Sequence, residues 1–343
     1  MATITTSDIA DLANTTLASY DFGKWTDISL DLQNYTMLKR IMANSDERSG
    51  EFMRDNIQTS NMGHARMTGL YEVDTYNNTD ITNKTTVPFR FFNTYALWDV
   101  NEVAMNAGDR VQLINLMKLR IHSSRNDAHV LAESQGWSKP ADSTDVTSLW
   151  GIPYWVVKNA SGSGEGSGGN PTGFSSGAGS ISSSTVTKWA NWADGYSTIS
   201  QSDFVRSCRR AVRQCEFTDP DPYAAAGSGQ KWGLYTNIDV LQELEEYGEN
   251  RTDNLGGDIA VMEGKMTFRR VPVTWVPYLD DDTRDPMYGI NWNFFGWSSL
   301  KGRNMVQSPQ ENPSNMHNCV AINTDNGGNF RCWNRRAQFV LSK

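Results

Sequence analysis

The chain has 343 residues and a mass of 38.4 kDa, which is enough for one large domain or two smaller ones. Its 31 Lys and Arg against 39 Asp and Glu give a net charge of −8, which argues against a basic nucleic-acid-binding protein and a polybasic membrane binder. No apolar run approaches a membrane span and no signal peptide is evident, so we expect no membrane association.

The aromatic content is high, with 12 Trp, 12 Tyr and 13 Phe. Surplus aromatic residues together with Met and Arg are typical of buried protein–protein contact surfaces. A sugar-binding groove rich in Trp would give a similar count. Four cysteines in a chain of this length indicate no disulfide framework.

The first 100 residues predict an arm followed by a β-ribbon. Residues 1–60 carry only scattered apolar side chains, which is typical of an arm that packs on something else. Residues 64–73 and 85–98 read as two strands joined by the polar tip 74–84. Apolar side chains fall on both faces of the second strand, and a ribbon apolar on both faces must be covered by its own domain or by another subunit.

The middle of the chain begins with the strongest predicted helix, 109–135, for which Asp109 is a plausible N-cap and Gly136 a stop. Its apolar stripe, continued by Leu131, predicts one buried face over a length of about 40 Å. The run 151–157 reads as a buried strand. Residues 159–184 are mostly Gly and Ser, and we expect an exposed loop insertion there.

The second half opens with a helix at 202–216, with Ser202 as N-cap. Its basic face is a solvated or salt-bridged surface, a subunit contact, or a patch near nucleic acid; its residues are Arg206, Arg209, Arg210 and Arg213. A strand at 231–236 and an acidic helix at 237–247 follow, and the acidic helix could pair with such a face on a neighbour. The chain is β-rich from 258 onward, with a hairpin expected at Asn326-Gly327.

No motif supports catalysis or cofactor binding. The glycines of 164–169 match a dinucleotide-binding pattern, but no helix follows them, and Ser175 lacks the strand-to-helix turn of a hydrolase nucleophile. The acidic cluster 280–285 lacks the Gly and Glu of a calcium loop and reads as a solvated turn. His317, Cys319 and Cys332 lack a fourth zinc ligand. We therefore expect no enzyme activity, no cofactor and no metal.

The order of elements resembles the major capsid protein of tailed bacteriophages, which has the Hong Kong 97-type fold. The C-terminal third carries the clearest likeness, in the segments FRRVPVTWVPYLDDD (268–282), MYGINWNFFGW (287–297) and HNCVAINTDNGGNFRCWNRRAQFVL (317–341). The resemblance implies an α+β fold with five parts: an N-terminal arm (1–60), an extended loop (61–100), part of a peripheral domain (101–195) containing a spine helix (109–135) and the Gly/Ser insertion (159–184), part of an axial domain (196–257), and a β-rich return through both domains (258–343).

The same resemblance implies a structural role in the virion. Copies would form pentamers and hexamers that tile an icosahedral shell around double-stranded DNA, held without sequence specificity and assembled in the host cytoplasm. A separate scaffolding protein and a portal are the expected partners, and a decoration protein is a further one. Some relatives form a lysine–asparagine crosslink, and Lys84 lies near the expected tip, but many relatives lack that bond and we predict none here. The candidate contact residues are Phe89, Phe91, Phe92, Tyr95, Trp98, Lys84, Arg206, Arg209, Arg210 and Arg213.

Three alternatives remain open at the level of sequence. An encapsulin-like nanocompartment shares the fold but encloses enzymes. Another phage structural protein, such as a tail or fibre component, would favour repeats, and none is visible. A carbohydrate-active enzyme would need opposed carboxylates about 5–9 Å apart, which a single acidic turn supplies poorly.

Overall fold

The computed structural model describes residues 35–41, 45–72, 78, 80–99, 101, 110–159, 165–215, 232–249, 259–262, 265–269, 271–309 and 318–343. The helices are α2 (Leu38–Ile41), α4 (Arg110–Gly136), α5 (Ile152–Trp155), α6 (Phe204–Gln214) and α7 (Ile238–Glu249), with short 3-10 turns at Thr187–Trp189, Pro277–Leu279, Trp292–Phe294 and Arg335–Ala337. The strands are β1 (Ser45–Arg48), β2 (Phe52–Gln58), β3 (Thr82–Pro88), β4 (Arg90–Asp99), β5 (Glu165–Ser167), β6 (Trp192–Gly195), β7 (Trp232–Thr236), β8 (Ile259–Met262), β9 (Lys265–Phe268), β10 (Val271–Trp275), β11 (Met287–Asn291), β12 (Phe295–Leu300), β13 (Val306–Gln307), β14 (Cys319–Cys332) and β15 (Phe339–Ser342).

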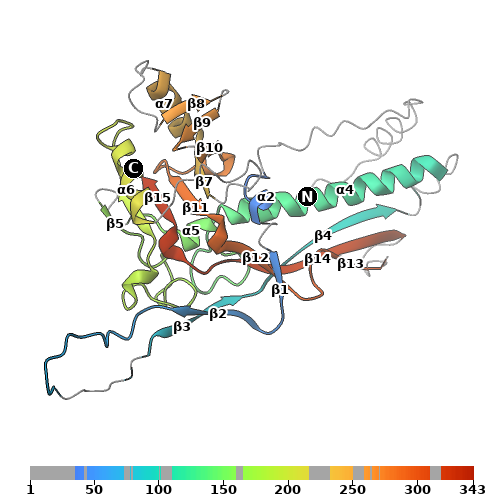
Figure 1. The fold of residues 1–343 in the computed structure, drawn as a ribbon. Helices are drawn as coiled ribbons and strands as arrows, with labels where there is room; N and C mark the ends of the chain where they lie inside the picture. Colours follow the sequence, from blue (N-terminus) through green and yellow to red (C-terminus); the bar gives the residue numbers. More distant parts are fainter. Residues whose placement is uncertain are drawn as a thin grey trace.

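The strands form two sheets and a separate ribbon (Figure 1). An eight-stranded sheet has the order β5-β6-β15-β11-β7-β10-β9-β8, and α6 and α7 pack on it. A five-stranded sheet has the order β1-β12-β14-β13, with β4 also paired to β14, and α4 runs beside β4. The ribbon of β2 and β3 projects from the body in a direction different from that of α4 (Figure 1). The α+β class predicted from the sequence is confirmed.

Both faces of the eight-stranded sheet are buried. Successive side chains of a strand point to opposite sides of the sheet, and here each side packs into its own apolar cluster. Phe339 and Leu341 of β15 pack in a cluster with α6 and α7. Val340, between them, points into a second and larger cluster, which contains α5 and much of the following segment. Tyr288 of β11 lies opposite Val340 and joins the same cluster. The sheet therefore separates two cores.

The predicted spine helix is confirmed as α4, within one residue at each end. A buried carboxylate near its C-terminal end, Glu133, accepts hydrogen bonds from the backbone amides of Met37 (2.7 Å) and Leu38 (2.8 Å) and from the indole of Trp137 (2.9 Å). Burial raises the pKa of Glu133, and these hydrogen bonds oppose the rise. The segment around Met37 is thereby fastened to α4 of its own chain. Leu131, which the sequence analysis placed on the buried apolar stripe of this helix, is exposed instead.

The ribbon differs from its prediction. Its first strand is β2, paired antiparallel with β3 from Phe52↔Pro88 to Gln58↔Thr82, whereas the predicted strand 64–73 has no strand structure as far as residue 72. The predicted second strand divides near Phe89, because β4 leaves the ribbon and pairs with β14. β1 and β2, which lie within the predicted arm 1–60, belong to the five-stranded sheet and to the ribbon. Residues 1–34 lie outside the described residues.

Two predictions for residues 151–184 are also wrong. The run 151–157 contains the helix α5 rather than a strand. The described part of the Gly/Ser segment, from 165 onward, packs into the body instead of forming an exposed insertion. Its few apolar residues, including Phe174 and Ile181, are buried, and the rest of the chain satisfies its backbone: Gly179 donates its amide to the Tyr154 hydroxyl and accepts from the amide of Thr86 in the ribbon. Composition alone underestimates such order because the partners lie elsewhere in the chain.

The expected hairpin at Asn326-Gly327 is absent, since β14 continues through both residues. Gly327 lies opposite Phe91 of β4, and a Cβ there would meet the Phe91 ring at 2.7 Å. The glycine therefore makes room for an aromatic ring on the sheet rather than for a turn. Other elements differ by little: α6 begins after Asp203 rather than Ser202, and α7 continues past the predicted stop at Gly248.

Replacing Gly151 with alanine should destabilise the fold. A Cβ at Gly151 would lie 2.3 Å from the Ser138 carbonyl oxygen, 2.4 Å from that of Gly136 and 2.5 Å from that of Gln135, and backbone atoms at the end of α4 cannot move aside cheaply. We expect a loss of about 2 kcal/mol or more in urea unfolding. Gly69→Ala is the control, because a Cβ there would have its nearest neighbour, the Glu72 carboxylate, at 3.9 Å. Equal midpoints for the two variants would contradict this packing.

Candidate subunit-contact surfaces

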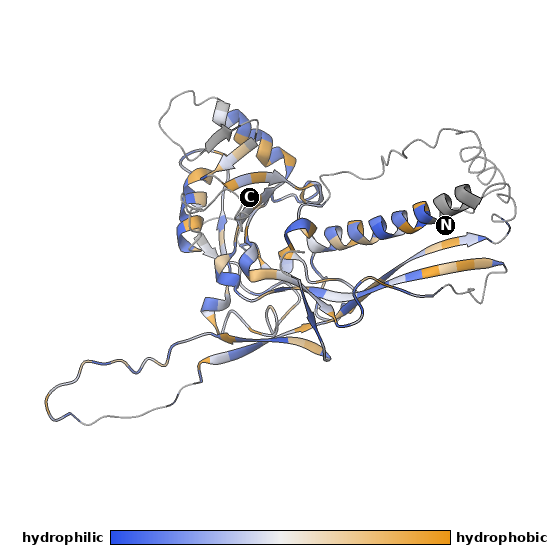
Figure 2. Ribbon diagram, turned by 45° about the vertical axis from the view of Figure 1, so that its right-hand side comes forward, coloured by the Kyte–Doolittle hydropathy of each residue, from blue (hydrophilic) through white to orange (hydrophobic). Residues whose placement is uncertain are grey.

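The loop between β2 and β3 exposes large apolar side chains. Leu70 is 92% exposed, and Met67 and Tyr71 are each 99% exposed, although a soluble chain gains free energy by burying such groups. Residues 59–72, the described part of this loop that follows β2, extend far from the body (Figure 2). Lys84, the last residue of the predicted polar tip 74–84, is exposed but lies within β3, opposite Asn56. The exposed side chains indicate a surface that requires a partner.

A second apolar surface lies on β4. Phe91 and Tyr95 are exposed, and Phe92 is half-buried. Phe91 and Phe92 line an open hollow of about 190 Å³ together with Leu131 of α4. Hydrophobic residues are also prominent along the outer half of the β4–β14 pair (Figure 2).

Two other predicted contact residues, Phe89 and Trp98, are buried in the chain's own fold. Phe89 belongs to the larger core cluster. Trp98 lies on the same face of β4 as the buried Ala96, two residues before it. These two side chains therefore have little area left for a neighbour.

The base of the ribbon is held by a cluster of four charged residues. Arg331 of β14 donates to both carboxylate oxygens of Asp55 at 3.0 Å and to Asp46 of β1 at 2.6 Å. Arg48 contacts the same two carboxylates, at 2.8 Å to Asp55 and 2.9 Å to Asp46. Ser298 also donates to Asp46. The cluster joins β1, the ribbon strand β2 and the five-stranded sheet.

The charge state of Asp46 depends on this cluster. Burial acts to raise its pKa, but hydrogen bonds from Ser298 and Arg48 and the charge of Arg331 outweigh burial, so the pKa lies below its ordinary value. Sequence reasoning missed these residues. No local pattern marks them, because Asp55 and Arg331 are 276 positions apart.

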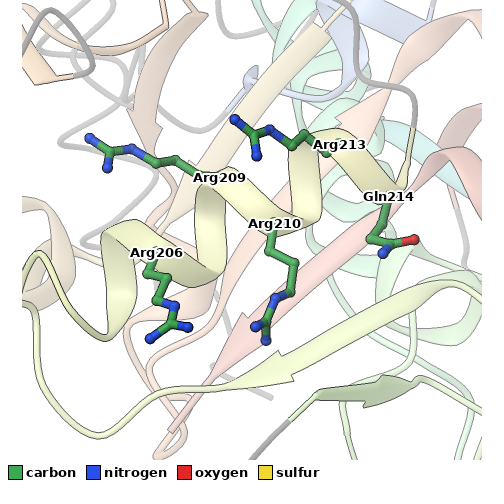
Figure 3. A pocket seen from close by; sticks show the side chains of 5 residues that line it. All are labelled: Arg206, Arg209, Arg210, Arg213 and Gln214. Carbon is green, nitrogen blue, oxygen red and sulfur yellow. The ribbon is translucent and has the colours of Figure 1, made fainter.

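The arginines of α6 form a third surface. Arg206 and Arg213 are exposed, Arg209 and Arg210 are half-buried, and the four line an open hollow of about 480 Å³ with Gln214. On the other side of the helix, the predicted buried face is confirmed: its residues are Phe204, Cys208, Ala211, Val212 and Cys215. Figure 3 shows the arginines directed away from the helix in two rows.

The acidic turn 280–285 is more than a solvated loop. Asp280 accepts from the backbone amide of Ile238 at the start of α7, at 2.9 Å, and Asp282 pairs with Lys158. Asp285 pairs with Lys343 at 2.7 Å. No group of three potential metal ligands occurs among the described residues, which exclude His317. In the described part of the chain, no helix is long and apolar enough to cross a membrane.

Comparison with protein-family models finds no match, and comparison with curated proteins finds none either. Solved structures do match over nearly the whole chain. The capsid asymmetric unit of cyanophage A-1(L) has a TM-score of 0.60 at 11% identity and covers 96% of this chain and 98% of its own. The capsid of phage XM1, a member of the Myoviridae, has a TM-score of 0.53 at 10% identity, over 93% and 94% of the two chains. The capsid of a native GTA particle has a TM-score of 0.52 at 14% identity, over 96% and 98%.

These matches cover more than nine-tenths of this chain and of each matched chain. The fold of this chain is therefore that of tailed-phage major capsid proteins, the Hong Kong 97-type fold.

Proposed function

We propose that this chain is the major capsid protein of a tailed bacteriophage, assembling as pentamers and hexamers into an icosahedral shell around double-stranded DNA. The observation that carries the proposal is the match to capsid subunits over more than nine-tenths of each chain. The exposed apolar side chains of the loop support it, because a shell supplies the cover that one subunit lacks.

The domain assignment follows the corrected elements. The ribbon β2–β3 with its loop corresponds to the extended loop, α4 to the spine helix, and the five-stranded sheet to the peripheral domain. The eight-stranded sheet with α6 and α7 corresponds to the axial domain. A separate scaffolding protein, a portal and a decoration protein are the proposed partners, and assembly takes place in the host cytoplasm.

The direct test is assembly of the purified chain. Negative-stain electron microscopy and sedimentation velocity should reveal rings or closed shells, alone or after co-expression with the scaffolding protein of the same phage. A folded monomer at every concentration under both conditions would contradict the proposal. Shells that package DNA in the infected host would separate a capsid from a compartment for other cargo.

Replacing Met67, Leu70 and Tyr71 together with serine should prevent assembly. These side chains are almost fully exposed in the subunit, so their loss removes apolar contact with a neighbour and little of the subunit's own packing. We expect an unchanged unfolding midpoint but no shells by electron microscopy. The control is His64→Ser with Thr68→Ser, two exposed polar residues of the same loop. Normal shells from the triple variant would remove the loop from the proposed contact.

A further inference from the structure

The two helices that pack on the eight-stranded sheet, α6 and α7, carry surfaces of opposite charge, and the residues of the two surfaces have the same spacing along the helix. The first is on α6, which contains four arginines and no acidic residue. These arginines occupy positions 206, 209, 210 and 213, an i, i+3, i+4, i+7 series that covers one side of a helix. Figure 3 shows Arg206 and Arg210 in one row and Arg209 and Arg213 in the other.

The second surface is on α7, which contains five acidic residues and no basic one. Its exposed positions are Asp239, Gln242, Glu243 and Glu246, which repeat the same i, i+3, i+4, i+7 series. Val240 and Leu244 occupy the opposite side and are buried against the sheet. Each series covers eight residues, and its first and last positions lie about 10.5 Å apart along the helix axis. The two surfaces thus match in length and pattern and are opposite in charge, with four arginines on one and three carboxylates and Gln242 on the other.

The two helices lie toward opposite edges of one sheet. α6 packs on β6 and β15, whereas α7 packs on β8, β9 and β10. In the order β5-β6-β15-β11-β7-β10-β9-β8, these groups are separated by β11 and β7. A contact between different surfaces at the two edges is heterologous, and repeated contacts of that type close into a ring when the rotation fits.

We propose that the arginine surface of α6 binds the acidic surface of α7 in the next copy of the chain, with the two helices antiparallel. This pairing rests on the proposed function and specifies the contact that closes the ring. Antiparallel packing sets Arg206 opposite Glu246 and Arg213 opposite Asp239, and it aligns the helix dipoles favourably. In the same chain, Lys343 lies close enough to Glu243 and Asp239 for their charges to raise its pKa, and its hydrogen bond goes to Asp285.

Ion pairs of this kind supply orientation and partner choice more than affinity, whereas like charges brought together repel strongly. Charge reversal is therefore the sensitive test. Arg206→Glu should raise the concentration for half-maximal assembly at least tenfold, as should Glu246→Arg, both measured by sedimentation velocity at low ionic strength. The double variant Arg206→Glu/Glu246→Arg should return that concentration to within about twofold of the unmodified chain.

Two controls make the result specific. Lys188→Glu makes the same charge change at an exposed site on another element and should leave assembly unchanged. The mismatched variant Arg206→Glu/Asp239→Arg should stay defective. Rescue by that variant would overturn the antiparallel arrangement.

The remaining outcomes separate this pairing from the proposed function. If the unmodified chain never assembles, the proposed function fails and the pairing with it. If it assembles and both single reversals do so equally well, the pairing alone is wrong. Loss of double-stranded DNA retention in Arg206→Glu shells of normal stability would also overturn it and assign the arginines to phosphate contact. Circular dichroism of each variant separates misfolding from loss of contact.

Discussion

Arg335→Ala should lower the free energy of unfolding by at least about 4 kcal/mol, enough to leave most of the chain insoluble. The Arg335 side chain is fully buried against residues 155–191. Its guanidinium donates to the carbonyl oxygens of Trp155 (2.7 Å), Trp189 (3.0 Å) and Gly169 (3.0 Å). It also donates to the side-chain oxygen of Asn191 at 3.2 Å. Burial lowers its pKa to about 10, so the group stays charged at neutral pH. Alanine would remove the donor from three buried carbonyl oxygens and leave a cavity in their midst, whereas the Asn191 oxygen would keep its hydrogen bond from the Val157 amide at 3.0 Å.

The neighbouring Arg336 provides a matched control, because it is exposed. Arg336→Ala should change stability by no more than about 0.5 kcal/mol in urea unfolding. Arg335→Lys keeps the charge but cannot reproduce the planar fork of donors, so we expect most of the loss to remain. If Arg335→Ala and Arg336→Ala unfold at the same urea concentration, the buried arginine does not organise this region.

Arg331→Ala should cost about 3 kcal/mol and loosen the base of the ribbon. Removing the most buried member of a partly buried ion cluster leaves Asp46 and Asp55 with Arg48 as the remaining cation of the cluster. Hydrogen exchange should accelerate first in β1 and β2. Arg303→Ala is the control, because Arg303 forms an exposed pair with Asp325 and such pairs contribute little. Equal exchange in the two variants would contradict the anchoring role.

The same cluster predicts a dependence on pH. The pKa of Asp46 is lower in the folded chain than its ordinary value of 3.8. Its ionised form therefore stabilises the fold above that value, and this contribution is lost as the pH falls through the folded-state pKa. Unfolding measured below pH 4 should show a smaller acid-dependent loss in Asp46→Asn than in the unmodified chain. An identical acid dependence would show that Asp46 contributes nothing to it.

Local patterns located the longer helices α4, α6 and α7 to within a few residues, whereas the short α5 was predicted as a strand. The positions of the longer helices therefore depend mainly on nearby residues. The first ribbon strand could not be found this way, because FMRDNIQ has little strand character and is held by β3 and by Arg331. The prediction for the Gly/Ser segment was wrong for a similar reason, since the segment is held in place by hydrogen bonds with Arg335 and Tyr154.

The many aromatic side chains lie in two kinds of environment, the chain's own core and its exposed surface, and composition could not distinguish them. Trp137, Trp150 and Trp292 lie in the chain's own core, whereas Tyr71 and Tyr95 are exposed. Residue type is equally suited to a core and to an interface, so only the tertiary arrangement distinguishes them. The contact roles of Phe91, Phe92, Tyr95 and the α6 arginines remain predictions.

The position of β15 has a consequence for synthesis of the chain. Phe339–Ser342 is an interior strand of the eight-stranded sheet, between β6 and β11, which were translated long before it. Until β15 emerges from the ribosome, both neighbours present unpaired edges, and the two cores on either side of the sheet stay open. The eight-stranded sheet therefore cannot form completely until translation has passed β15. A chain truncated before residue 339 should aggregate rather than fold into a subunit that assembles poorly.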